Sequence, residues 1–122
     1  LSGAHSMTRT SLLLSLLLIA STSEAASFNC NKASTYAEKT ICDNPVLSNL
    51  DEILSHNYSV MMGANIGEGA RADLRATQRR WLAQRDQCKD PKCLKILYEV
   101  RINEISDYPV LSGVFPNCRS SF

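Results

Sequence analysis

Residues 70–107 read ARADLRATQRRWLAQRDQCKDPKCLKILYEVRINEISD, and this stretch decides the fold. Apolar side chains recur at three- and four-residue steps on both sides of Lys89-Asp90-Pro91, as they do along one face of an α-helix. Asp90 is a favoured helix N-cap and Pro91 a favoured first helical residue. We therefore predict one helix over about residues 70–88 and another over about 91–107, and their short connection makes them antiparallel. The inner faces are expected to use Ala70, Leu74, Thr77, Trp81 and Cys88 from the first helix, and some of Leu94, Leu97, Tyr98, Val100, Ile102 and Ile105 from the second.

Two further helices are predicted upstream. Thr35-Tyr36-Ala37-Glu38 has the pattern of a capping box and opens a short helix that ends near Cys42. Asn44 caps a longer helix that begins at Pro45, carries an apolar stripe and ends at glycines near residue 63. No stretch alternates long enough to be a strand. We expect an all-α domain over residues 26–107, a small up-down helical hairpin or bundle of about four helices, followed by an irregular C-terminal tail over residues 108–122.

Length and charge narrow the class of protein. The chain has 122 residues, 44% of them hydrophobic and 20% charged, which is typical of one globular domain. The formal net charge is +1, so the chain lacks the basic footprint of a nucleic-acid-binding protein. We expect a protein partner and no nucleic acid.

Residues 7–25 have the pattern of a secretory signal peptide, and we expect residues 1–6 to be either a foreign remnant or an upstream extension, because Met7 has the character of a natural start. Arg9 supplies the positive end, and residues 12–20 form an apolar run that is too short to span a membrane, which takes about 20 residues. Small residues in Ser23-Glu24-Ala25 predict cleavage after Ala25, and no cysteine follows there to carry a lipid. We expect a periplasmic or secreted protein without stable membrane insertion after cleavage.

The cysteine content fits such a compartment. Five cysteines are present, and in an oxidising environment they are expected to form disulfides, each worth roughly 2–4 kcal/mol to a small domain. We favour local pairing, Cys30 with Cys42 and Cys88 with Cys93, because each pair lies close along the chain. A competing scheme links Cys30 or Cys42 to the Cys88–Cys93 end. In the local scheme Cys118 stays free or forms an intermolecular bridge.

The sequence contains no recognisable catalytic set. His56 is a lone histidine on the expected second helix, and we interpret it as a surface residue rather than a general base. Cys88 and Cys93 have a loose zinc-ligand spacing, but export favours a disulfide there. We therefore predict a protein that is not an enzyme and that holds no metal and no cofactor.

Charged residues of the third expected helix have two interpretations. Arg71, Arg75 and Arg79 fall four apart on one face, which is either a solvated surface or a contact surface for an anionic partner. A second set is expected to form a structural network between the second and third helices, and it comprises Asp51, Arg80, Trp81, Arg85 and Asp86.

A family pattern runs through residues 28–106. Its pieces are Phe28-Asn29-Cys30, Ala33, Glu38-Lys39-Thr40-Ile41-Cys42, Leu47-Ser48-Asn49-Leu50-Asp51, Tyr58, Leu74, Gln78-Arg79-Arg80-Trp81-Leu82, Arg85-Asp86, Cys88, Cys93-Leu94, Tyr98 and Arg101-Ile102. In their order and spacing these pieces resemble the lysozyme-inhibitor LprI-like family. The resemblance implies a small secreted helical domain with disulfides and, for some members, inhibition of lysozyme.

If this chain inhibits lysozyme, we expect it to bind through shape complementarity with the enzyme rather than through electrostatic attraction. Animal lysozymes are basic, and a net charge of +1 gives no electrostatic attraction to them. The Asn65–Gly69 turn or the 108–122 tail would then occlude the substrate cleft, and Arg71 could anchor to the carboxylates that such clefts carry. The alternative is a periplasmic envelope-associated interaction module, or an immunity protein, without a lysozyme target.

Overall fold

The computed structural model describes residue 3 and residues 26–121, and within them it contains helices and no strand. The elements are a 3-10 helix η1 (Cys30–Lys32), followed by α1 (Tyr36–Asp43), α2 (Pro45–Gly63), α3 (Glu68–Arg85) and α4 (Pro91–Ser106). The predicted all-α bundle of four helices is confirmed. The predicted signal peptide lies outside the described residues. No helix in residues 26–121 has the length and apolar character needed to cross a membrane.

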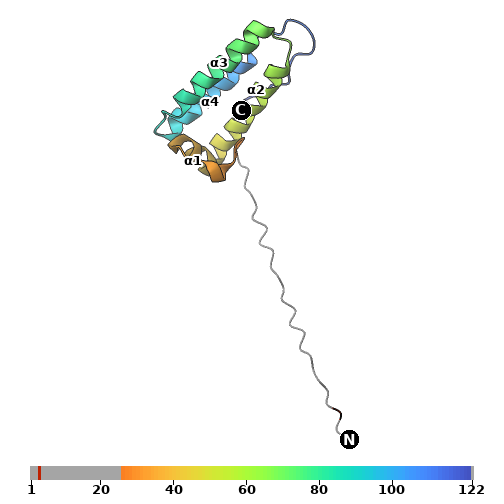
Figure 1. Cartoon of the computed structure of the whole chain (residues 1–122). Helices are drawn as coiled ribbons and strands as arrows, with labels where there is room; N and C mark the ends of the chain where they lie inside the picture. Colours follow the sequence, from red (N-terminus) through yellow and green to blue (C-terminus); the bar gives the residue numbers. More distant parts are fainter. Residues whose placement is uncertain (1–2, 4–25, 122) are drawn as a thin grey trace.

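The three long helices run up, down and up. α2 and α4 are parallel neighbours and share the most extensive interface, whereas α3 runs antiparallel and packs on α4 (Figure 1). α1 lies across the end of the bundle where α2 begins, close to the turn between α3 and α4. Since α2 and α3 pack against α4 rather than closely against each other, one face of the bundle is left open between them.

Local capping explains where three of the four helices begin. The Thr35 hydroxyl accepts from the Glu38 N–H while the Glu38 carboxylate accepts from the Thr35 N–H, so the predicted capping box is confirmed. Asn44 accepts from two amides of α2, and Asp90 accepts from the Cys93 N–H at 2.9 Å. Each contact satisfies backbone donors that have no partner within the helix.

The bounds of α3 differ from the prediction. The helix begins at Glu68, two residues before the predicted start at Ala70. Gly67 has a positive φ of 84°, which lets the backbone turn sharply into the helix at that point. The helix ends at Arg85, before the predicted Cys88, and the chain then turns so that Cys88 can meet Cys93.

The core is built from buried apolar side chains of all four helices. Burial of one such side chain contributes about 1.5–3 kcal/mol. Val100 is 51% exposed on the outer face and Leu97 is partly buried. The side chains of α4 that are at most 1% exposed are Leu94, Tyr98, Ile102 and Ile105.

Both disulfides have the local pairing. Cys30 bonds Cys42 with a Cα–Cα distance of 5.8 Å, and Cys88 bonds Cys93 with a Cα–Cα distance of 5.7 Å. The competing scheme is therefore wrong, because each pair is brought together by its own turn. Cys118 is unpaired and half-buried. Both bridges lie at the end of the bundle that holds α1, and we call it the disulfide end.

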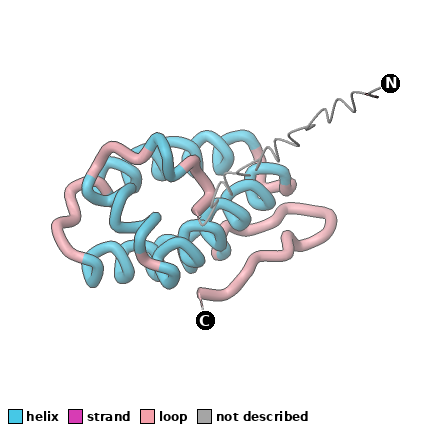
Figure 2. Tube along the Cα trace, turned by 90° about the horizontal axis from the view of Figure 1, so that it is seen from below, coloured by secondary structure: helices cyan, strands magenta, loops and turns pink. Residues whose placement is uncertain are grey.

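The tail after α4 contains no helix or strand in its described residues, and it runs along the outside of the bundle (Figure 2). The Tyr108 hydroxyl donates to Asp73 of α3 at 2.7 Å, and the Leu111 N–H then donates to the Asn65 carbonyl in the α2–α3 turn at 2.8 Å. The tail then follows α2, and Asn57 exchanges two hydrogen bonds with the backbone of Arg119, at 2.9 and 2.7 Å. The tail is thus fastened at both of its ends.

Candidate functional site

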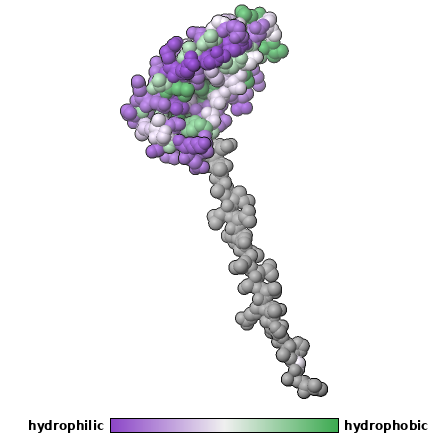
Figure 3. Space-filling model, in the orientation of Figure 1, coloured by the Kyte–Doolittle hydropathy of each residue, from purple (hydrophilic) through white to green (hydrophobic). Residues whose placement is uncertain are grey.

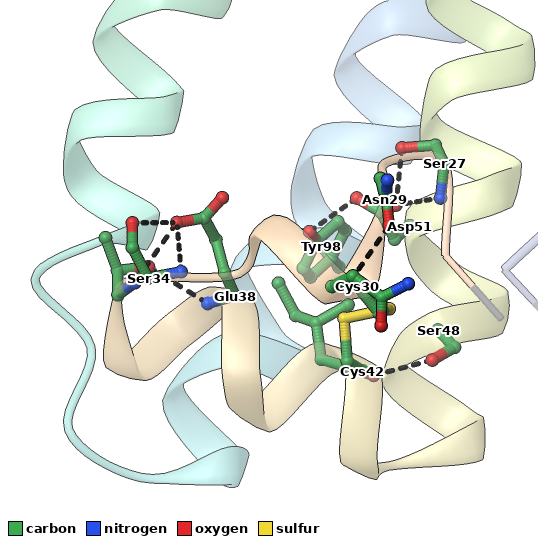
Figure 4. The surroundings of a disulfide bond; sticks show 12 residues. Ser27, Asn29, Cys30, Ser34, Glu38, Cys42, Ser48, Asp51 and Tyr98 are labelled. Carbon is green, nitrogen blue, oxygen red and sulfur yellow. Dashed lines mark hydrogen bonds between the residues drawn. A yellow bond between two sulfur atoms is a disulfide. The ribbon is translucent and has the colours of Figure 1, made fainter. Parts of the chain in front are cut away.

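A buried carboxylate lies at the centre of the disulfide half of the molecule. Asp51 of α2 is 4% exposed and accepts three hydrogen bonds (Figure 4). The Tyr98 hydroxyl donates to Oδ1 at 2.8 Å, and the N–H and hydroxyl of Ser27 donate to Oδ2 at 2.7 and 2.5 Å. These bonds satisfy a charge that would otherwise be costly to bury, and they tie the segment before η1 to α2 and α4.

Tyr98 is the link between the helices. Burial, together with the negative charge of Asp51, raises the pKa of Tyr98 far above its ordinary value. The hydroxyl therefore keeps its proton and remains a donor to Asp51. The Trp81 ring meets Tyr98 edge to face at a centroid distance of 4.9 Å, and its indole N–H donates to the Leu97 carbonyl.

Arg85 extends this cluster to α3. Its Nε and Nη2 both donate to Asp86, at 3.0 and 2.9 Å. Burial opposes the charge on Arg85, but the neighbouring Tyr98 hydroxyl and the Asp86 carboxylate outweigh it and raise its pKa. Arg85 consequently stays charged although its side chain is only 9% exposed.

Four of the five expected network residues thus gather around Tyr98, whereas Arg80 does not. Arg80 is exposed on the other side of α3 and forms no ion pair within residues 26–121. Sequence reasoning missed Tyr98 and Ser27 as members. The sequence did hold one signal of them. Asp51 lies on the apolar stripe of α2 beside Leu50 and Leu54, and a carboxylate buried there needs hydrogen-bond donors from other segments.

Above this cluster lies an open groove of about 440 Å³ between α2, α3 and the segment before η1. Asp51, Trp81 and Arg85 form part of its floor. Figure 3, which has the same orientation as Figure 1, shows green hydrophobic atoms between the purple atoms of the flanking helices. Side chains that line the walls include Phe28, Glu38, Tyr58, Arg75, Arg79 and Leu82.

The three arginines predicted to share one face of α3 have two different environments. Arg71 donates to the Met62 and Ala64 carbonyls at 2.9 and 2.8 Å and pairs with Glu68, so it holds the α2–α3 turn together. Arg75 and Arg79 are exposed at the groove and have no ion-pair partner among the described residues. Of the three arginines in the row, these two present free guanidinium groups to the groove.

At the opposite end of the bundle, the Asn65–Gly69 turn and the tail form one protrusion. Besides the Leu111 bond, the Asn65 amide donates to the Ser112 hydroxyl at 2.5 Å. Green hydrophobic atoms gather at this end in Figure 3. We call its three large exposed apolar side chains the apolar tip: Leu111 at 69%, Val114 at 92% and Phe115 at 63% exposure.

The remaining candidates lie in the tail or under it. His56 contacts the Asn117 carbonyl through Nε2 at 3.0 Å, and Cys118 packs against the core as an unpaired thiol. Asn57, which sequence reasoning also missed, is fully buried where it fastens the tail. In the described part of the chain, no three histidine, cysteine or acidic side chains come together as metal ligands.

Comparison with known proteins identifies a family. The family model described as lysozyme inhibitor LprI covers residues 30–105, which is more than half of the chain and includes both disulfides. No curated protein and no solved structure shows significant similarity to the chain. The expected resemblance is confirmed, and this protein belongs to the LprI lysozyme-inhibitor family.

Proposed function

We propose that this protein is exported to the periplasm and inhibits a lysozyme-type muramidase by inserting the apolar tip into the substrate cleft. One observation carries the proposal. The two segments that the sequence offers for insertion, the Asn65–Gly69 turn and the tail, are joined by hydrogen bonds into a single protrusion. Two disulfides and the signal-peptide pattern of residues 7–25 support export.

The tip has the character of a binding element. Val114 and Phe115 are largely exposed although they are apolar, and clustered exposed apolar side chains mark interaction sites. The backbone beneath them is fixed by Asn65 and, through the turn, by Arg71. A segment that is ordered before it binds loses less conformational entropy in the complex. The protein would thus act by occlusion and would need no catalytic group.

The charge of the protein bears on the mode of binding. With a net charge of +1 there is no attraction to a basic lysozyme, so contact must depend on shape and apolar burial. The donors of Arg71 are used within the turn, so its part in this proposal is to hold the tip rather than to contact the cleft.

Inhibition assays with matched variants test the proposal. The oxidised protein, recovered from the exported fraction, is assayed in excess against several classes of lysozyme. Val114→Ser combined with Phe115→Ser removes the centre of the tip, and we expect inhibition at least about tenfold weaker. Val100→Ser combined with Ile96→Ser is the control, because these residues are 51% and 50% exposed on α4. Absence of inhibition by the unchanged protein, or equal loss in both variants, would refute the proposal.

The near-neutral charge favours a second candidate, an envelope-associated interaction module or immunity protein without a lysozyme target. A photo-crosslinking residue at position 114 separates the two in the compartment itself. Capture of an envelope protein or a toxin, with no muramidase captured or inhibited, would favour this alternative.

A further inference from the structure

We propose that the groove between α2 and α3 is a second binding site, which takes a ligand with an apolar body that ends in a carboxylate. The site differs from the apolar tip, because none of the tip residues lines the groove. Its volume of about 440 Å³ lies within the usual range of small-ligand pockets, about 300–1,000 Å³.

The charged end of the ligand is set by Arg75 and Arg79. They lie one helical turn apart on α3, both face the groove, and neither has an ion-pair partner within residues 26–121. A guanidinium group can donate two parallel hydrogen bonds to a carboxylate, which gives geometric selectivity as well as affinity.

The other charged groups of the groove are already occupied. Asp51 accepts from Tyr98 and Ser27, and Arg85 is bonded to Asp86. Glu38 caps α1, and the Thr35 N–H lowers the pKa of Glu38, so it stays negative. The groove is lined by three arginines and two carboxylates, so it attracts an anion whether the ligand carries one charge or two. Free phosphate has no apolar body to fill the space, so the groove favours a carboxylate that ends an apolar chain.

Apolar side chains set the body of the ligand. Phe28, Leu54, Tyr58, Trp81 and Leu82 come from three separate segments and line the same space. Leu82 is 37% exposed and Phe28 is partly buried, so an apolar ligand that enters the groove removes their remaining surface from water. A fatty acid and the free end of a short apolar peptide share this chemistry.

Titration of the full exported protein with defined probes tests the site. The probes are octanoate, N-acetyl-Leu-Ala-Leu as the free acid, the same peptide as its amide, and inorganic phosphate. We expect amide signals of Ser55, Gln78 and Leu82 to shift in nitrogen–proton correlation spectra, and the emission of Trp81, the sole tryptophan, to change. An acid should bind at least about tenfold more tightly than the amide, as charge-assisted hydrogen bonds predict. Comparison of octanoate with the peptide acid then identifies the source.

Variants of neighbouring arginines supply the control. Arg75→Gln combined with Arg79→Gln should weaken binding of the acid by about tenfold and leave the amide unchanged. Arg80→Gln, next along the helix but outside the groove, should leave the affinity within about twofold. Unfolding curves establish that each variant is folded. Equal affinity for acid and amide, phosphate binding as tight as either acid, shifts confined to other surfaces, or no binding at roughly 5 mM acid would overturn the proposal.

Discussion

The two ends of the bundle are held together by different means. At the disulfide end, two covalent bridges fasten η1 to α1 and close the α3–α4 turn. At the tip end, the α2–α3 turn and the tail are held by hydrogen bonds from Asn65, Arg71 and Asn57. Covalent closure at one end fixes the scaffold, whereas the end that we propose for binding depends on weaker contacts.

The difference follows from the lengths of the elements. α1 has eight residues, and an isolated helix of that length is unstable in water. Its bridge to η1 and the Ser48 hydroxyl, which donates to the Ile41 carbonyl at 2.6 Å, supply the missing support. The tip end continues two helices of 19 and 18 residues, whose own packing positions the turn. The Cys30–Cys42 cross-link therefore lies where local structure is weakest.

Removal of the disulfides should produce the largest loss of stability. The Cys30–Cys42 bridge spans 12 residues and the Cys88–Cys93 bridge spans 5. Loop-closure entropy then predicts losses of about 3 and about 2 kcal/mol in the free energy of unfolding when each pair is replaced by serine. Urea unfolding of both double variants measures the difference. A larger loss from the Cys88–Cys93 pair would contradict the argument from α1.

Tyr98→Phe should be next in size. The change removes the hydroxyl that donates to buried Asp51 and keeps the ring against Trp81. Hydrogen bonds to charged groups contribute about 1.5–3 kcal/mol, so we expect a loss of roughly 2 kcal/mol in unfolding free energy. Tyr36→Phe, whose residue is 44% exposed, is the control and should change stability by less than about 0.5 kcal/mol. Similar losses in both variants would show that Asp51 does not depend on Tyr98.

Most of the fold could be predicted from the sequence because its signals are local. Capping at Thr35, Asn44 and Asp90 lies within a few residues of each helix start, and the apolar stripes show which faces are buried. The bounds of α3 were misjudged for a local reason too. Gly67 gives no side-chain cap to recognise, and Cys88 continues the apolar spacing of α3 although the chain has already turned.

The site was less predictable, because it depends on contacts between distant segments. The bond between Asp51 and Tyr98 joins residues 47 apart and requires the register of α2 against α4. The sequence marked the turn and the tail as candidate contact segments, but nothing local indicates that Asn65 meets Leu111 and Ser112. The groove was missed altogether, since it is the space that remains where α2 and α3 do not pack together.

Asn57→Ala should release the end of the tail. The fully buried amide exchanges two hydrogen bonds with Arg119, and its loss should cost about 1–2 kcal/mol in unfolding free energy. The half-buried thiol of Cys118, next to Arg119, should then react several-fold faster with a thiol reagent. Asn103→Ala, at an exposed site on α4, serves as the control. An unchanged labelling rate would show that the tail is held elsewhere.

The smallest expected effects come from Arg71 and Arg75, which lie one turn apart on α3. Arg71 holds the turn that carries the apolar tip, whereas Arg75 faces the groove. Arg71→Gln removes the donors to the Met62 and Ala64 carbonyls, so we expect a loss of about 1 kcal/mol and weaker lysozyme inhibition through a looser tip. Arg75→Gln removes an exposed charge with no ion-pair partner in residues 26–121, and stability should change by less than about 0.5 kcal/mol. Urea unfolding and the inhibition assay, run on both variants, should show loss in the first alone. If Arg75→Gln weakens inhibition and Arg71→Gln does not, lysozyme contacts the groove face, and the division between a binding tip and a separate groove is wrong.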